Sequence, residues 1–142
     1  MRKKVPILAA ILLVASLPVQ AQQLRITELM AVPLSGEAEW IELRNIGSAP
    51  VSVLGWTIED RTGKRISVGD DAHIAPGGCL LLAEAWPLGQ RWSPARDSAV
   101  VMASLPSLNN GGDDIVLRDM QGGMMDSVSY ASSWLDGKGI SL

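Results

Sequence analysis

The chain has 142 residues and a mass of 15.1 kDa, which is the size of one domain. Hydrophobic residues make up 47% and charged residues 19%, so the chain is too apolar to be disordered, and its 14 Gly and 8 Pro lack the period of collagen. A single Cys excludes a disulfide framework and a zinc site built on cysteines.

The first 21 residues are predicted to be a secretory signal peptide. Three positive charges within 1–4 precede an apolar run over 5–17, and Val19 and Ala21 are the small residues that signal peptidase requires. The apolar run is shorter than the roughly 20 residues that span a bilayer, so an uncleaved membrane anchor is the less favoured alternative. We therefore expect cleavage after Ala21 and an exported protein that is periplasmic, surface-bound or secreted.

Removal of this segment changes the charge of the molecule. The mature domain, 22–142, has 121 residues with nine basic and 15 acidic side chains, and its net charge is −6 instead of −3. Nucleic-acid binders need basic side chains to displace counterions. We therefore expect no nucleic acid among its partners, and no membrane-spanning segment in the mature chain.

Short apolar runs bounded by turn residues follow one another along the mature chain, without a sustained helical period. The predicted strands are 24–30, 39–46, 51–54, 56–60, 64–68, 79–84, 98–103, 114–119 and 124–130. Within 39–46, Ile41 and Leu43 point to one face while Glu42 points to the other, which is typical of a half-buried strand. Eight or nine short strands indicate an all-β sandwich or barrel.

Six stretches, in this order along the chain, carry a family resemblance. They are Ile26–Leu29, Glu39–Asn45, Leu54–Asp60, Ile74–Ala83, Leu108–Leu117 and Asp126–Tyr130. Together they resemble the lamin-tail domain, an immunoglobulin-like β-sandwich found in nuclear lamins and in many secreted bacterial proteins. The resemblance implies an interaction or surface-display module, often joined to hydrolases or nucleases in exported proteins.

The sequence departs from the family pattern at three places. Ala31–Pro33 stands where the first strand of the family usually runs into an Asn-Pro turn, and 86–97 is longer and richer in Trp than expected. The last segment, Gly137–Leu142, looks like the beginning of the family's final strand. We expect that strand either to be short or to continue in a longer protein.

Acidic residues gather at three places and are candidates for carboxylate chemistry, which includes glycoside hydrolysis and calcium binding. They are Glu37, Glu39 and Glu42, then Asp70 and Asp71, then Asp113 and Asp114. Glu39 and Glu42 differ in strand parity and are not expected to pair. Asp113 and Asp114 follow an Asn-Gly turn, where carboxylates commonly accept hydrogen bonds from local backbone. Calcium at Asp113 and Asp114 is the weaker alternative.

The sequence contains no motif that indicates a catalytic nucleophile or a metal site. His73 is the only histidine, no Gly-x-Ser-x-Gly segment is present, and Cys79 begins a continuously apolar run that predicts a central strand and a buried, structural thiol. One His and one Cys do not make a metal cluster. We therefore predict no catalytic residue, no metal site and no cofactor.

The tryptophans divide into sheet and loop residues. Trp40 and Trp56 lie in predicted strands and are expected in core or half-buried positions. Trp86 and Trp92 bracket a loop and are the predicted binding residues, because exposed aromatics anchor partners or stack on sugars. The alternative is that both cap the open end of the sandwich.

The sequence therefore predicts a non-catalytic, exported interaction or surface-associated accessory module that binds an unidentified protein or cell-envelope partner. One alternative is the N-terminal part of a larger exported hydrolase or nuclease whose active site lies beyond residue 142. A calcium-stabilised module of an envelope assembly is another.

Overall fold

The computed structural model describes residues 24–69, 72–84, 98–102, 104–135, 137–139 and 141–142. These residues form ten strands and one short 3₁₀ helix. The elements are β1 (Leu24–Met30), β2 (Trp40–Asn45), β3 (Val51–Ser52), β4 (Thr57–Glu59), β5 (Arg65–Ser67), β6 (His73–Ile74), β7 (Cys79–Ala83), β8 (Ser98–Met102), β9 (Gly112–Arg118), β10 (Met124–Ala131) and η1 (Ser132–Trp134).

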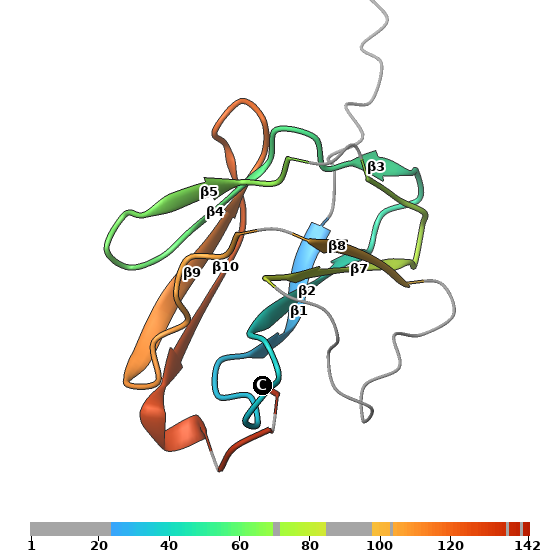
Figure 1. Cartoon of the computed structure of the whole chain (residues 1–142). Helices are drawn as coiled ribbons and strands as arrows, with labels where there is room; N and C mark the ends of the chain where they lie inside the picture. Colours follow the sequence, from blue (N-terminus) through green and yellow to red (C-terminus); the bar gives the residue numbers. More distant parts are fainter. Residues whose placement is uncertain (1–23, 70–71, 85–97, 103, 136, 140) are drawn as a thin grey trace, which may run out of the picture.

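Two four-stranded sheets pack face to face (Figure 1). The first sheet has the order β1-β2-β7-β8 and the second has the order β10-β9-β4-β5. Neighbouring strands are antiparallel, except that β7 and β8 are parallel. A two-stranded sheet of β3 and β6 lies at one end. The fold is an all-β, immunoglobulin-like sandwich, as predicted.

All nine predicted strands are present. Six are shorter than predicted, whereas β9 begins two residues earlier and β10 ends one residue later. The range of β1 is the predicted one, and the strand predicted over 98–103 is confirmed over Ser98–Met102, where it pairs with β7. The two-residue strand β6 was not predicted, because its pairing with β3 depends on residues more than 20 positions away. Within β9, Ile115 and Leu117 are buried while Val116 is half-buried, which is the alternation of a strand with one face in the core.

The core lies between the two sheets and is continuous. Leu43 of the first sheet, Ile115 of the second sheet and Trp56, which precedes β4, are almost completely buried in it. A second, small apolar cluster lies on the other face of the first sheet and is made by Met30, Trp40, Leu81 and Ala83. Trp40 and Trp56 are therefore buried, as the sequence predicted.

The structure corrects the prediction for Cys79. Its thiol is half-buried and not buried, because Cys79 is the first residue of β7 and lies opposite Arg44, whose side chain is exposed. Burial and the neighbouring carboxylate of Glu42 raise the pKa of this thiol. A raised pKa keeps the sulfur protonated and makes it a weak nucleophile.

Two edge strands lie along the same side of the sandwich. β1 is one edge of the first sheet, β10 is one edge of the second, and the two strands contact each other (Figure 1). The C-terminal residues return to this side and pair with β1 through backbone hydrogen bonds between Leu142 and Leu29. Among the described residues, no helix is long and apolar enough to cross a membrane.

Candidate interaction groove

The predicted binding residues Trp86 and Trp92 lie outside the described residues, and so do Asp70 and Asp71. Binding by Trp86 and Trp92 therefore stays a prediction. His73 is described: it lies in β6 with an exposed side chain. In the described part of the chain, no three His, Cys, Asp or Glu side chains are placed to hold a metal ion.

Asp113 and Asp114 have different surroundings although they are neighbours. The Asp113 carboxylate is fully buried and accepts hydrogen bonds from the backbone N–H groups of Arg61, Asn109 and Asp114, and from the Asn109 amide side chain. The Asp114 carboxylate is exposed and forms an ion pair with Arg61 at 2.7 Å, which lowers the pKa of Asp114. The local-donor interpretation describes Asp113 well, and calcium stays an untested alternative.

Glu39 and Glu42 do not pair. The Glu39 carboxylate accepts a hydrogen bond from the Leu108 N–H at 3.0 Å, whereas Glu42 accepts one from the Thr27 hydroxyl at 2.7 Å. Burial raises the pKa of Glu39, against the effect of the Leu108 hydrogen bond. Glu84 accepts a hydrogen bond from the Leu105 N–H at 3.1 Å. Glu39 and Glu84 therefore bind the backbone of the segment before β9 and stabilise the fold there.

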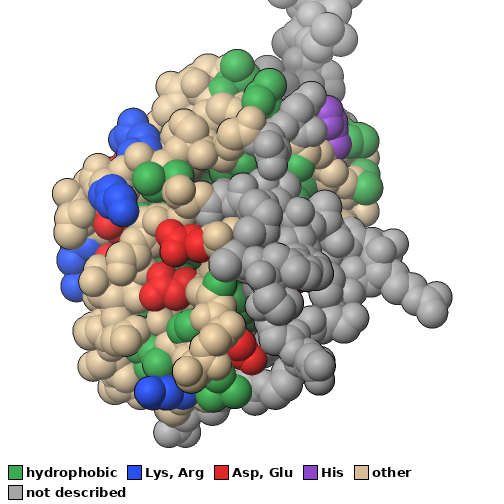
Figure 2. Space-filling view, viewed as in Figure 1, with side chains coloured by type: hydrophobic (Ala, Val, Ile, Leu, Met, Phe, Trp, Pro, Cys, Tyr) green, Lys and Arg blue, Asp and Glu red, His purple; other side chains and the backbone are tan. Residues whose placement is uncertain are grey.

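Charged side chains on the outer face of the second sheet form ion pairs across strands. Glu59 of β4 accepts hydrogen bonds from Arg118 of β9 at 2.8 Å and from Arg65 of β5 at 2.6 Å, and these lower its pKa. Figure 2 shows positive and negative side chains next to each other over β4 and β5. Because these charges neutralise each other, this face attracts neither a polyanion nor a polycation strongly.

An apolar groove opens between the two edge strands β1 and β10. It has a volume of about 420 Å³. One wall is the stretch of β1 from Ile26 to Leu29, and the other is formed by Val128 and Tyr130 of β10. Trp134 and Leu142 complete the lining. A hollow of this size with mostly apolar walls is typical of binding sites.

Trp134 is the most exposed apolar side chain of this lining. It ends η1, which has no buried residue, and 58% of its surface is accessible. Large aromatic side chains are usually buried, and exposed ones are frequent contact residues in interfaces. The sequence did not reveal the groove, because the groove joins residues about 100 positions apart.

The polar groups around the groove already have partners within the chain. At the Ile26 end, the Asp126 carboxylate accepts hydrogen bonds from the Ile26 N–H at 2.8 Å and from the Arg25 guanidinium at 2.9 Å. At the other end, the Ser141 hydroxyl donates to the Glu28 carboxylate. Burial raises the pKa of Tyr130, whose hydroxyl donates to the Asn109 carbonyl at 3.1 Å. The groove thus offers mainly apolar contact, and the charged side chains beside it are held by hydrogen bonds within the chain.

The comparison with protein families identifies the fold. The family model described as Lamin Tail Domain matches residues 18–132, which is most of the chain. This chain belongs to the lamin tail domain family. The match ends inside η1, so Trp134 and the C-terminal side of the groove lie beyond the part that this lamin tail domain shares with its family model.

Comparisons with individual proteins add little to this. No curated protein matches the chain. Among solved structures, the archaellum periplasmic stator protein FlaG from Sulfolobus acidocaldarius is similar, with 16% sequence identity over 77% of this chain and 99% of that chain and a TM-score of 0.41. A likeness at this level says nothing about the function of this lamin tail domain.

Proposed function

We propose that this lamin tail domain is a non-catalytic interaction module of an exported protein and that it binds a partner polypeptide in the groove between β1 and β10. The observation that carries the proposal is the apolar groove beside the exposed side chain of Trp134. An aromatic side chain at the mouth of an apolar groove is a common anchor for a protein partner.

Export and the domain limits belong to the same proposal. The charged beginning of the chain, the apolar run and the small residues before position 22 support a cleaved signal peptide, and the folded domain then lies within 22–142. N-terminal sequencing of the exported protein tests this part, and the expected first residue is Gln22. An intact Met1 on the exported protein would contradict it.

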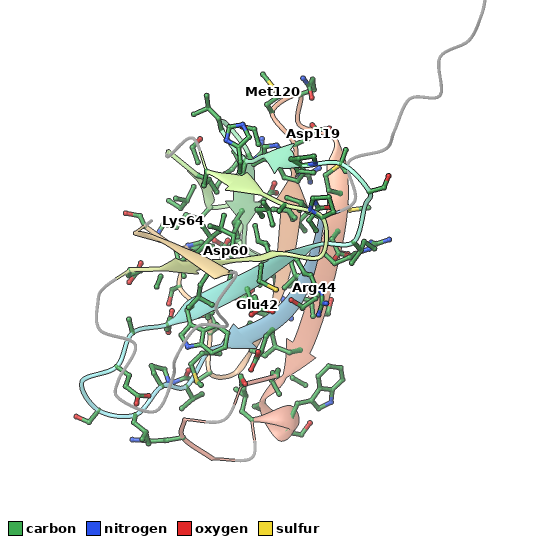
Figure 3. The ribbon with its side chains drawn as sticks, turned by 90° about the vertical axis from the view of Figure 1, so that its right-hand side faces the viewer. Glu42, Arg44, Asp60, Lys64, Asp119 and Met120 are labelled. Carbon is green, nitrogen blue, oxygen red and sulfur yellow. The ribbon has the colours of Figure 1, made fainter. Side chains whose placement is uncertain are left out.

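Site-specific photocrosslinking in living cells tests the binding site. We place p-benzoylphenylalanine at position 134, beside the groove, and at position 120 as the control. Met120 has 68% of its surface exposed and lies at the tip of the β9–β10 hairpin, whereas η1 lies at the other end of β10 (Figure 3). Both sites are exposed, so neither replacement is expected to disturb folding.

The proposal expects a discrete protein adduct from position 134 and none from position 120. The adduct should disappear when Val128→Lys puts a charge into the groove wall. No adduct from position 134, or equal adducts from both positions, would contradict binding in the groove.

A further inference from the structure

The outer edge of β1 already pairs with extended backbone at one end of the groove. The Leu29 N–H donates to the Leu142 carbonyl at 3.1 Å, and the Leu142 N–H donates to the Leu29 carbonyl at 2.9 Å. The Gly139 N–H donates to the Val32 carbonyl at 2.7 Å. Residue numbers rise from 139 to 142 as they fall from 32 to 29, so this segment runs antiparallel to β1.

The direction of this segment leads into the groove. Continued past Leu142, a strand would follow β1 from Leu29 toward Ile26, along the wall that lines the groove. At Ile26 the position of a neighbouring strand's carbonyl is taken by the Asp126 carboxylate, which accepts the hydrogen bond of the Ile26 N–H. Unpaired backbone groups at a sheet edge are a template for another strand. A strand added here would meet the irregularity of β1 between Ile26 and Glu28 and would displace Asp126 from the Ile26 N–H.

The side chains show which residues such a strand needs. Leu29 is buried, and Leu142, directly opposite, packs against the same core. Side chains of directly paired residues lie on the same face of a sheet, and every second residue of a strand returns to that face. The next inward side chain would therefore enter the apolar space beside Val128 and Tyr130.

We propose that the groove binds an extended segment of a partner polypeptide, which adds to β1 as an antiparallel strand and continues the pairing that Leu142 begins. This inference rests on the proposed function and specifies how the partner binds. The segment carries apolar, β-branched residues at every second position, because these fit a pleated strand and fill the groove. At Ile26, a carbonyl of the segment takes over the hydrogen bond from Asp126.

A synthetic peptide tests this mode of binding. The probe is acetyl-Thr-Val-Thr-Val-Thr-Val-Thr-Lys-amide, added to ¹⁵N-labelled 22–142 and followed by NMR. Amide shifts are expected at Ile26, Glu28 and Leu29 of β1 and at Val128 of β10. The control region is β5 (Arg65–Ser67), an edge strand of the second sheet away from the groove. Equal shifts at β5 would mean unspecific edge pairing and would overturn the proposal.

Methylation of single peptide nitrogens separates strand addition from simple apolar contact. Successive N–H groups of a strand point to opposite sides, so only every second one faces β1. N-methylation of a central residue whose N–H faces β1 should weaken binding at least tenfold. N-methylation of the next residue, whose N–H points away, should weaken it less than twofold. Equal effects at these two positions would overturn strand addition, while the crosslink from position 134 would still support an interaction groove.

A matched pair of variants locates the peptide in the groove. Val128 lines the groove, whereas its neighbour Ser127 is exposed and points to the other face of β10. Val128→Lys should weaken binding of the probe at least tenfold, and Ser127→Lys less than twofold. Unchanged binding to a folded V128K protein would overturn the proposal. If V128K does not fold, binding of the two N-methylated peptides to the wild-type domain is the deciding test.

Discussion

Asp113 and Asp114 show how the surroundings of a side chain decide what it does. Asp113 is buried and accepts four hydrogen bonds, which tie the turn at Asn109 to the turn at Arg61. Asp114 points to solvent and pairs with the Arg61 side chain, which is itself exposed. A buried carboxylate that satisfies backbone donors stabilises a fold far more than an exposed ion pair does.

Asp113→Ala should therefore be strongly destabilising. Loss of the carboxylate leaves the N–H groups of Arg61, Asn109 and Asp114 without their acceptor, and we expect the free energy of unfolding to fall by about 3 kcal/mol. Asp114→Ala is the matched control and should unfold close to the wild type. Urea denaturation of both variants measures this, and equal midpoints for the two would contradict the assignment.

Sequence reasoning at this scale is limited by distance along the chain. The Asn-Gly turn indicated that Asp113 accepts local hydrogen bonds, because Asn109 is only four residues away. The pairing of Asp114 with Arg61 joins residues 53 positions apart, and no spacing rule predicts it. The half-buried state of Cys79 was missed for the same reason, since an apolar run does not show where its first residue lies in the sheet.

At the scale of elements, the β9–β10 hairpin depends on a glycine. Gly112 begins β9 with a φ of +105°, a conformation that other residues adopt rarely. A Cβ at this position would come within 2.7 Å of the Tyr130 carbonyl oxygen and 3.1 Å of the Ala131 Cα. Both atoms belong to the backbone of β10, so neither can move aside without disturbing the strand pair.

Gly112→Ala should consequently destabilise the domain by about 3 kcal/mol, from backbone strain and the contact with β10 together. Gly111→Ala is the control, because a Cβ there meets nothing within 4 Å and its φ is not in the left-handed region. Thermal melting followed by circular dichroism measures both variants. Similar melting temperatures for G111A and G112A would show that the hairpin tolerates a side chain at Gly112.

The strands were easier to predict from the sequence than their arrangement in space. Alternation of residues such as Ile115 and Leu117 is a local property, so the longer strands were found from the sequence. The groove is different, because it exists only when β1 and β10 lie on the same side of the sandwich and the chain returns to pair with Leu29. The predicted site at Trp86 and Trp92 came from residue type alone, and it stays a prediction.

At the scale of the whole molecule, the two sheets share one core. Leu43 of β2 and Leu117 of β9 belong to the same buried cluster, although their strands lie in different sheets. Glu59 and Arg65 form an ion pair within one sheet, and Arg25 and Asp126 form one between the sheets, but exposed pairs of this kind contribute little. The two sheets are therefore held together mainly by burial of apolar side chains in the core that they share.

One shared core predicts that both sheets unfold together. Leu43→Ala removes a completely buried side chain and should lower the free energy of unfolding by about 3 kcal/mol, whereas Leu54→Ala, at a side chain with 49% of its surface exposed, should change it by less than about 0.5 kcal/mol. Urea unfolding of each variant, followed by tryptophan fluorescence and by far-ultraviolet circular dichroism, should give coincident transitions. Separate transitions in L43A would show that the second sheet holds together without the first, and that the two faces are joined less tightly than their shared core implies.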